Sequence, residues 1–561
     1  MRFRDYDTIR IVPVHPKTAL SEEAPSTTEI PKVGKALASH ISHWAQTRPS
    51  ATAYLGGVTP LSWSDYDSAS EDLAQRLVGE LGLARGDRVA VLLPDGPEVH
   101  IALVACEKAG LVAAGIGPRA GRSEIQHLLG LTGARALISR PLHQDQVMAE
   151  LVEDFRSHNP SLEHHLCVKG ELGSQQTLEL NGEAMPPQKL SKARLQPVSR
   201  NDLFLLNSTS GTTGMPKCVT HDQERWFAFH GLAVPRAQLS DADIFMSVVP
   251  APFGFGIWTS HITPTILGVP CVVMPRFDAE EALALIEEHR VSVLAAVSTQ
   301  FIMMLEAEGA QTRDLSSLRV LFTGGEAVPY ARAAEFEERT GACVLQFYGS
   351  NETGAVSGTS LDDSREARLR TAGKPIPEMN LRLFDEEGND VTAQKQGQPG
   401  CRGPTLSKGY YGPGEEVEQA NRELIRPDGW MMLGDRVVLD DEGYLRVVGR
   451  IDDFIIRGGK NVSGLAVEER VAEHPRVALA AAVAMPDRVF GERVCVYVEL
   501  RPGETDLPLD ELLDDLMARG VSKETWPEKL VILDRLPRGS GGKVAKEALR
   551  QDIRQRLADR T

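Results

Sequence analysis

The chain lacks the cysteine patterns of metal-binding and disulfide-rich proteins. Its 561 residues include seven cysteines, at positions 106, 167, 218, 271, 343, 401 and 495, and no two of them form a Cys-x-x-Cys pair. The usual zinc spacings are therefore excluded, and the distribution does not resemble a disulfide framework. Scattered free cysteines are typical of a reducing compartment, so we expect a cytoplasmic protein.

Long apolar runs and an excess of positive charge are also missing. The most apolar stretch, residues 101–117, is interrupted by Glu107 and Lys108, so we expect no transmembrane segment. The first twenty residues carry charges without an apolar core, which argues against a signal peptide. A net charge of −17 argues against a nucleic-acid partner, because such proteins normally carry a basic patch.

The length predicts two or more domains, and the composition, 42% hydrophobic and 25% charged, is that of a globular protein. We read residues 1–30 as an extended arm. Apolar strand patterns at 89–94, 111–116 and 134–138 alternate with a helical pattern at 98–109. This alternation predicts crossover units, a parallel sheet and the α/β class, with one such sheet before residue 208 and one after it. Residues 160–200 read as polar and irregular, with His164 and His165 expected to be solvated.

The most informative stretch, STSGTTGMPKCVT, begins at Ser208 and directly follows an apolar strand pattern at 203–206. Glycines let a backbone approach a ligand, and hydroxyls, exposed N–H groups and an ammonium suit a polyphosphate. The alternative is a Ser/Thr/Gly-rich surface loop. It is not the common P-loop, because Pro216 precedes Lys217 where that motif has glycine. The candidate phosphate-binding residues are Thr209, Ser210, Gly211, Thr212, Thr213, Gly214 and Lys217.

STSGTTGMPK resembles the phosphate-loop signature of the adenylate-forming enzymes, which include acyl-CoA synthetases, aryl-acid ligases, luciferases and peptide-synthetase adenylation domains. The resemblance runs in the expected motif order from about residue 35 to the end. It implies a large N-terminal domain, 31–451, of two parallel-sheet αβαβα subdomains plus a small barrel-like subdomain. A small mobile C-terminal α+β domain, 452–561, would follow a hinge at Asp452.

The resemblance also implies the nucleotide site. A strand ending in Gly324, Gly325 and Glu326 would hold the adenine, and a second strand leads into a Tyr-Gly-x-x-Glu signature. There Tyr348 would stack on adenine and Glu352 would bind Mg²⁺, because a hard cation prefers carboxylate oxygen. Asp435 and Arg450 would hold the ribose. The further nucleotide contacts from the second strand are Gln346, Phe347, Gly349, Ser350 and Asn351, where Asn351 replaces the usual threonine.

The resemblance places the acyl pocket in residues 248–268, at Phe253, Gly254, Phe255, Gly256 and Trp258. The alternative is a core segment at a bend, because core aromatics outnumber ligand-contacting ones. We expect the glycines to leave room for a bulky acid. No acidic residue occurs in this segment, so an amino-acid substrate would have its ammonium desolvated without a partner.

In the C-terminal domain, Lys543 matches the family's adenylation lysine, and Gly458 and Gly459 match the loop that faces the thiol. Two departures occur here and near the phosphate loop. Gly464-Leu465-Ala466 stands where the family has Pro-x-Glu, and Cys218 replaces a glycine. Because of the first departure, the sequence does not determine the shape of the tunnel through which the thiol would reach the site.

The resemblance therefore implies an ATP- and Mg²⁺-dependent carboxylate–CoA ligase that forms an acyl-AMP, with Lys217, Glu352 and Lys543 as its catalytic residues. Its partners would be ATP, coenzyme A and an apolar acid, for example an alicyclic, branched or steroid side-chain acid. The sequence also leaves a medium-length fatty acid open. The sequence leaves open an enzyme that loads a carrier protein in trans, a luciferase-like oxygenase and a non-catalytic nucleotide-binding protein. The sequence identifies neither the acid substrate nor the oligomeric state.

Overall fold

The computed structural model describes residues 36–56, 59–170, 177–185, 193–209, 215–326, 328–457, 460–539 and 543–558. The predicted arm, residues 1–30, lies outside the described residues. Residues 35–561 form one compact unit, and the α/β class is confirmed. Within the described ranges, none of the helices combines the length and the apolar character needed to cross a bilayer.

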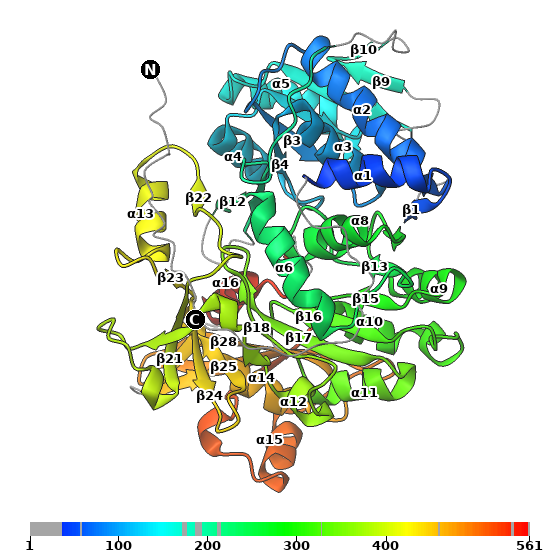
Figure 1. Cartoon of the computed structure of the whole chain (residues 1–561). Coiled ribbons are helices and arrows are strands. Elements are labelled where there is room, and N and C mark those ends of the chain that lie inside the picture. The colour runs from blue at the N-terminus through cyan, green and yellow to red at the C-terminus, as the bar shows by residue number, and fades with distance from the viewer. Residues whose placement is uncertain are drawn as a thin grey trace. The chain divides into compact units, whose positions relative to one another are not determined.

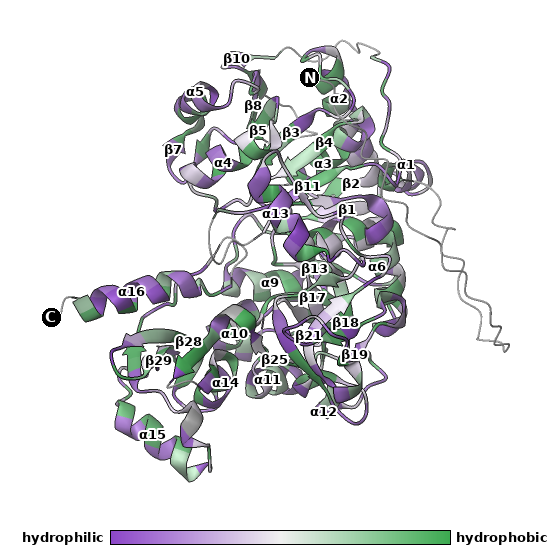
Figure 2. Ribbon diagram, turned by 90° about the vertical axis from the view of Figure 1, so that its left-hand side faces the viewer, coloured by the Kyte–Doolittle hydropathy of each residue, from purple (hydrophilic) through white to green (hydrophobic). Residues whose placement is uncertain are grey.

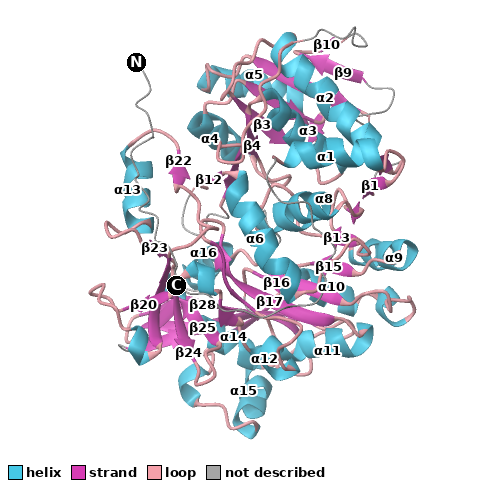
Figure 3. Ribbon diagram, in the orientation of Figure 1, coloured by secondary structure: helices cyan, strands magenta, loops and turns pink. Residues whose placement is uncertain are grey.

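The first sheet has a parallel centre and antiparallel edges (Figures 1 and 3). Its order is β10-β9-β8-β5-β3-β4-β11-β12-β22. The parallel strands are β3 (Arg88–Leu92), β4 (Val112–Gly115), β5 (Ala136–Ser139), β8 (His164–Lys169) and β11 (Leu205–Ser208). The antiparallel edge strands are β9 (Thr177–Leu180), β10 (Glu183–Ala184), β12 (Cys218–His221) and β22 (Tyr410–Tyr411).

Helices cover both faces of the first sheet, as apolar strands in a parallel sheet require. In Figure 1, α4 (Arg122–Thr132) and α5 (Met148–His158) lie on one side of β3 and β4, and α2 (Trp63–Gly79) and α3 (Pro97–Ala109) lie on the other. The helix α1 (Leu37–Thr47) packs beside α2. A short hairpin, β6 (Leu142–His143) and β7 (Gln146–Val147), precedes α5.

The second sheet has the order β19-β18-β17-β16-β15-β13-β14-β1-β2. Its parallel strands are β1 (Thr52–Leu55), β13 (Phe245–Ser247), β14 (Cys271–Val272), β15 (Val293–Ala295), β16 (Val320–Gly324) and β17 (Cys343–Ser350). The antiparallel edges are β2 (Leu61–Ser62), β18 (Gly354–Gly358) and β19 (Lys374–Pro375). Its apolar core lies against α9 (Ala279–His289), α10 (Ser298–Glu306) and α11 (Tyr330–Thr340). The other helices in this part of the chain are α6 (Gln223–Arg236), α7 (Gly254–Gly256), α8 (Thr263–Leu267) and α12 (Arg365–Arg370).

Two smaller sheets complete the chain. The third is formed by β20 (Arg382–Phe384), β21 (Gln396–Cys401), β23 (Met431–Met432), β24 (Asp435–Leu439) and β25 (Leu445–Arg450). The helix α13 (Glu415–Leu424) buries only Ala420 of its own residues, and it is drawn mostly in the hydrophilic colour in Figure 2. The fourth sheet joins β26 (Phe454–Arg457), β27 (Lys460–Ser463), β28 (Val477–Asp487), β29 (Gly491–Leu500) and β30 (Lys529–Ile532). Its helices are α14 (Gly464–Ala472), α15 (Leu509–Ala518) and α16 (Lys546–Ala558).

Two expectations from the sequence are wrong. Residues 160–200 are not irregular throughout, because β8 is a buried strand at 164–169. His165 is only 4% exposed, and its Nε2 lies 2.9 Å from the Ser139 hydroxyl, so it is not solvated. The two sheets also do not divide at the phosphate loop. The second sheet contains β1 and β2 from before the loop, and the first contains β22 from far after it.

Candidate active site

The predicted phosphate loop is closed at its base by two backbone-directed hydrogen bonds. The N–H of Thr209 donates to the carbonyl of Lys217 at 2.9 Å, and the N–H of Lys217 donates to the Thr209 hydroxyl at 3.2 Å. β11 leads into this loop and its antiparallel neighbour β12 leaves it. The loop residues Ser210, Gly211, Thr212, Thr213 and Gly214 lie outside the described residues, as do Gly458 and Gly459 of the predicted thiol-facing loop.

Tyr348 and Asp435 meet at the predicted ribose and adenine end. The Tyr348 hydroxyl donates to Asp435 Oδ2 at 2.7 Å, and Asp435 lies opposite Arg450 in the β24–β25 pair. Burial raises the pKa of Asp435, while the Tyr348 hydrogen bond and the charge of Arg450 oppose this rise. Burial and the neighbouring Asp435 raise the pKa of Tyr348 well above its usual value, so its phenol remains a donor. Among the described residues, nothing donates a hydrogen bond to the other Asp435 oxygen.

Lys543 is held on a narrow hairpin. The N–H of Gly539 donates to the Lys543 carbonyl, and the N–H of Ala545 donates to the Pro537 carbonyl, each at 2.8 Å. Glu499 fixes the start of this segment, because its Oε1 accepts from the Leu536 N–H at 2.6 Å. Because two hydrogen bonds join the two sides of the hairpin, the backbone of Lys543 is fixed, and its side chain can reach only nearby groups.

The ammonium of Lys543 reaches the glycine turn after β16. It donates to the carbonyl of Gly325 at 2.6 Å. Burial lowers the pKa of Lys543, and the nearby carboxylate of Glu326 opposes this shift most strongly. Glu326 itself accepts from the N–H of Thr299 at 3.2 Å, at the start of α10. A Cβ on Gly325 would lie 2.8 Å from the Lys543 nitrogen, so the tip of the lysine would have to shift, and the positive φ of Gly325, 78°, also favours glycine.

Glu352, Tyr410 and Lys217 form the predicted polyphosphate end. Glu352 is 9% exposed, and its Oε1 accepts from the Tyr410 hydroxyl at 2.7 Å. The Lys217 ammonium lies 4.8 Å from the centre of the Tyr410 ring. No group of three or more His, Cys, Asp or Glu side chains within the described ranges could hold a metal alone. This donor set fits Mg²⁺, which typically binds through one or two carboxylates together with substrate phosphates.

A buried network behind Glu352 was not anticipated from the sequence. Arg225 on α6 is 2% exposed and donates to the carbonyls of Asn351 at 2.9 Å and Glu352 at 3.2 Å. It also donates to the Thr405 carbonyl at 2.8 Å, and its Nη1 lies 2.8 Å from His221 Nδ1. Burial lowers the pKa of Arg225 to about 10, which still leaves the guanidinium charged at neutral pH. One signal was available: Arg225 lies four residues before Phe229 and eight before Ala233, on the buried face of the helix.

The network continues to the predicted acyl segment through Asn207. His221 Nε2 lies 2.7 Å from Asn207 Oδ1, and the Asn207 amide donates to the Pro252 carbonyl at 2.9 Å. The amide of Asn351 donates to Asn207 Oδ1 at 2.6 Å. The residue that departs from the family pattern is therefore paired with Asn207.

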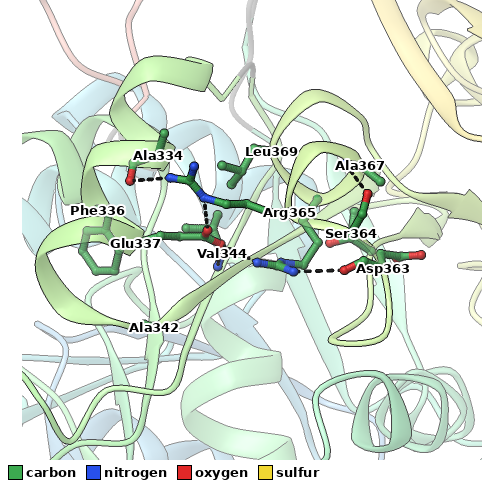
Figure 4. A network of polar contacts seen from close by, with 12 residues as sticks. Ala334, Phe336, Glu337, Ala342, Val344, Asp363, Ser364, Arg365, Ala367 and Leu369 are labelled. Carbon is green, nitrogen blue, oxygen red and sulfur yellow. Dashed lines mark hydrogen bonds and ion pairs between the residues drawn. The ribbon is translucent and has the colours of Figure 1, made fainter.

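Gln346 uses its amide to hold a helix end. It donates to the carbonyls of Arg368 at 2.8 Å and Leu369 at 3.1 Å, at the C-terminal end of α12. That helix is fixed by Glu337, which accepts from Arg365 at 2.9 Å, as Figure 4 shows. The amide nitrogen of Gln346 is thus committed to the fold, and its carbonyl oxygen is the group left for a base edge.

The aromatic residues of the predicted acyl segment join Phe347 in one cluster. The ring centres of Phe255 and Phe347 lie 4.9 Å apart, and those of Trp258 and Phe347 lie 5.7 Å apart. Trp258 is 1% exposed, and its indole N–H has no hydrogen-bond partner among the residues that the structure describes. Phe229 packs on Trp258 at 4.6 Å. The segment is helical from Gly254 to Leu267 and includes a π-helical stretch, Ile257–Ile262.

The expectation that the glycines leave room for an acid is wrong at both positions. A Cβ on Gly254 would lie 2.6 Å from Asn351 Oδ1. One on Gly256 would overlap the carbonyl oxygens of Val249 and Pro250. These glycines allow close packing of protein against protein.

Two family models match the chain: that of the AMP-binding enzymes over residues 41–411, and that of the AMP-binding enzyme C-terminal domain over residues 466–543. The sequence is 29% identical over 526 residues to the medium-chain fatty-acid–CoA ligase of Escherichia coli (strain K12), covering 93% of this chain and 91% of that protein. It is 32% identical over 504 residues to the long-chain-fatty-acid–CoA ligase of Thermus thermophilus, covering 86% and 88%.

Relatives with other printed activities match over a similar length. The 2,3-dihydroxybenzoate-AMP ligase of Bacillus subtilis (strain 168) is 29% identical over 507 residues, covering 89% of this chain and 90% of that protein. The crystal structure of the anthranilate CoA ligase AuaEII in complex with anthranoyl-AMP has a TM-score of 0.82 at 24% identity. It covers 94% of this chain and 98% of that one, which establishes the shared fold.

Proposed function

The chain belongs to the AMP-binding enzymes, the adenylate-forming acid ligases, and from that premise we propose that it is an ATP-dependent carboxylate–CoA ligase. The carboxylate of an apolar acid would attack the α-phosphorus of ATP, releasing pyrophosphate and leaving an acyl-AMP. The thiol of coenzyme A would then displace AMP. The observation that carries the proposal is the contact of the Lys543 ammonium with the Gly325 carbonyl, which brings Lys543 to the strand end that also carries Glu326.

The first step brings several anions together, so it requires charge stabilisation more than proton transfer. The Lys543 ammonium contacts the predicted adenine turn, and Lys217 lies at the predicted polyphosphate end. We propose that Lys543 bridges the attacking carboxylate and the α-phosphate, and that Lys217 holds the leaving phosphates. A magnesium ion held by Glu352 would neutralise phosphate charge when bound.

The nucleoside would be fixed by the Tyr348–Asp435 pair. Asp435 keeps one carboxylate oxygen outside this hydrogen bond, and Arg450 lies across the strand pair. A carboxylate with a free oxygen is a good acceptor for ribose hydroxyls. The adenine would lie at the Gly324–Glu326 turn and along Tyr348.

The second step would need a different arrangement. Lys543 occupies the glycine turn in this structure, so the loop that contains Gly458 and Gly459 would face the acyl-AMP only after a rotation about Asp452. Hinge motion of a small domain is a common way to exchange catalytic groups. Asp452 lies in the short 3₁₀ turn Ile451–Asp453 between β25 and β26.

The acid would be apolar and ring-containing. The Phe229, Phe255, Trp258 and Phe347 cluster offers ring faces, and the indole N–H of Trp258, unpaired within the described part of the chain, offers one donor. Aromatic side chains of this kind pack well against flat or cyclic groups. A pyrophosphate-release screen with a panel of acids distinguishes aryl, alicyclic and steroid side-chain substrates.

A pyrophosphate-release screen tests the proposal. Aliphatic, aromatic, alicyclic and steroidal acids would be supplied with ATP and Mg²⁺, with and without coenzyme A. We expect release that depends on one class of ring-containing acid, and an acyl-CoA product when coenzyme A is present. An acyl-AMP that coenzyme A cannot discharge would point to a carrier-protein loader, and ATP binding without release under any acid would point to a non-catalytic protein.

A further inference from the structure

Tyr410 touches both charged residues of the predicted polyphosphate end, although it belongs to neither signature stretch. Its hydroxyl donates to Glu352 Oε1 at 2.7 Å, and its ring faces the Lys217 ammonium at 4.8 Å. Burial and the Glu352 charge raise the pKa of Tyr410 above its usual value, so the phenol remains protonated. The Glu352 carboxylate therefore receives a neutral donor on one oxygen, and its other oxygen has no hydrogen bond to the described residues.

The backbone of Tyr410 is fixed from two sides. Tyr410 lies opposite Val219 in the β12–β22 pair, so it is attached to the strand that leaves the phosphate loop. On its other side, Asn421 of α13 accepts from the Tyr410 N–H at 2.7 Å and donates to the Tyr410 carbonyl at 3.0 Å. Gly409 permits this approach, because a Cβ there would lie 2.5 Å from Asn421 Oδ1. A side chain on such a backbone is held before any ligand arrives.

We propose that Tyr410 is a positioning residue that orients Glu352 for the metal–polyphosphate and keeps the Lys217 ammonium beside it. The proposal rests on the proposed function, because it assigns a role within the same site. A donor to one carboxylate oxygen fixes the plane of the carboxylate, so the free oxygen points in one direction. The ring adds a cation–π contact that restrains Lys217 at little cost to its charge.

The test separates the hydroxyl from the ring. Tyr410→Phe removes the hydrogen bond to Glu352 and keeps the ring under Lys217. The neighbouring Tyr411→Phe is the matched control, because Tyr411 lies on the same strand and packs against the apolar core of the first sheet. Binding of a non-hydrolysable ATP analogue is measured by calorimetry across a range of Mg²⁺ concentrations.

We expect Tyr410→Phe to raise the half-saturating Mg²⁺ concentration roughly 10-fold or more, as loss of a hydrogen-bonded partner of a metal ligand typically does. Analogue binding without Mg²⁺ should change much less. Tyr411→Phe should behave as the unmodified protein. Equal Mg²⁺ dependence in Tyr410→Phe, Tyr411→Phe and the unmodified protein would overturn the proposal.

A second variant keeps the test decisive if Tyr410→Phe does not fold. Asn421→Ala leaves the Tyr410 side chain intact and frees its backbone, so it should shift the Mg²⁺ dependence in the same direction by a smaller factor. No shift in Asn421→Ala, with Tyr410→Phe unfolded, would count against positioning. The binding assay needs no acid, so its outcome is independent of whether pyrophosphate release fails for every acid.

Discussion

The ammonium nitrogen of Lys543 lies 2.6 Å from the carbonyl oxygen of Gly325, 218 residues earlier in the chain. The contact joins the hairpin at 537–545 to the turn at the end of β16. The same lysine interacts electrostatically with the carboxylates of Glu326, Asp435 and Glu352. A single cation thus lies within reach of the groups predicted to hold the adenine, the ribose and the metal.

Replacing Lys543 should separate the two half-reactions. We expect Lys543→Ala to slow acyl-AMP formation on the order of 10²–10³-fold, because one preorganised charge is removed from the reacting centre. Thiolysis of supplied acyl-AMP should be retained. The two rates are measured separately, by acid-dependent pyrophosphate release and by acyl-CoA formation from synthetic acyl-AMP.

The control for Lys543→Ala is Lys395→Ala, which removes a lysine paired with the exposed Asp441 in the third sheet. It should leave both rates unchanged. Asp452→Pro, which restricts the predicted hinge, should slow thiolysis and spare acyl-AMP formation. If Lys543→Ala and Asp452→Pro lost both half-reactions to the same degree, the proposal that the C-terminal domain rotates about Asp452 between the two steps would fail.

The pH dependence of acyl-AMP formation should report the charge of Lys543. Burial lowers the pKa of this ammonium, so it loses its proton at a lower pH than an exposed lysine. The charged form is the one that neutralises the phosphate, so the rate should fall as the pH rises through this lowered pKa. Lys543→Arg keeps its charge at high pH, and its alkaline fall should move to higher pH or disappear. An unchanged alkaline limb in Lys543→Arg would assign that limb to another group.

The parts of the site that follow from the sequence are those with fixed local spacing. Tyr348, Glu352 and Asp435 lie at strand ends, and strand patterns are readable from short apolar runs. Tyr348 lies near the end of β17 and Glu352 just after it, whereas Asp435 begins β24 of the antiparallel third sheet, so its meeting with Tyr348 could be expected only from the resemblance. The Lys543 contact could be expected only from the resemblance, because no local pattern links positions so far apart.

The parts that did not follow are those decided by packing. The sequence predicts open space beside Gly254 and Gly256. In the structure, the positions that their Cβ atoms would take lie against Asn351 and backbone carbonyls. Arg225 is not among the residues that the sequence singled out, and it is buried against three carbonyls. His165 reads as a polar residue of a loop, but strand pairing with β5 buries it. Each depends on a neighbour distant in sequence, which single-sequence patterns do not contain.

The Arg225 network should matter for stability and for ATP binding together. Arg225→Lys keeps a charge but cannot reach three carbonyls, so some of them are left unsatisfied in the interior. We expect a loss of about 2–3 kcal/mol in the free energy of unfolding and a raised KM for ATP. Denaturant unfolding and initial-rate kinetics measure the two effects.

Arg236→Lys is the matched control for Arg225→Lys, because Arg236 is on the same helix and its Nη1 donates to one carbonyl, that of Gly358, at 3.0 Å. It should cost less stability and leave the KM for ATP unchanged. If Arg225→Lys lost stability and kept its KM for ATP, the network would contribute to folding and not to ATP binding.

The turn that receives Lys543 should not tolerate a methyl group. A Cβ on Gly324 would overlap the carbonyl oxygen of Phe347 and lie 3.2 Å from its ring. Overpacking of this kind typically costs about 1–3 kcal/mol, and here it would displace the strand end that carries the Gly325 carbonyl.

Gly231 provides the opposite case, because it lies in α6 with nothing within 4 Å of its Cβ position. Gly231→Ala should therefore stabilise the protein by about 0.5–1 kcal/mol through the higher helix propensity of alanine. Thermal unfolding of both variants, followed by acid-dependent pyrophosphate release, measures the contrast. Equal stability changes at the two positions would mean that the strand end can relax, and the tight fit between Gly324 and Phe347 would then not be what fixes the position of Gly325.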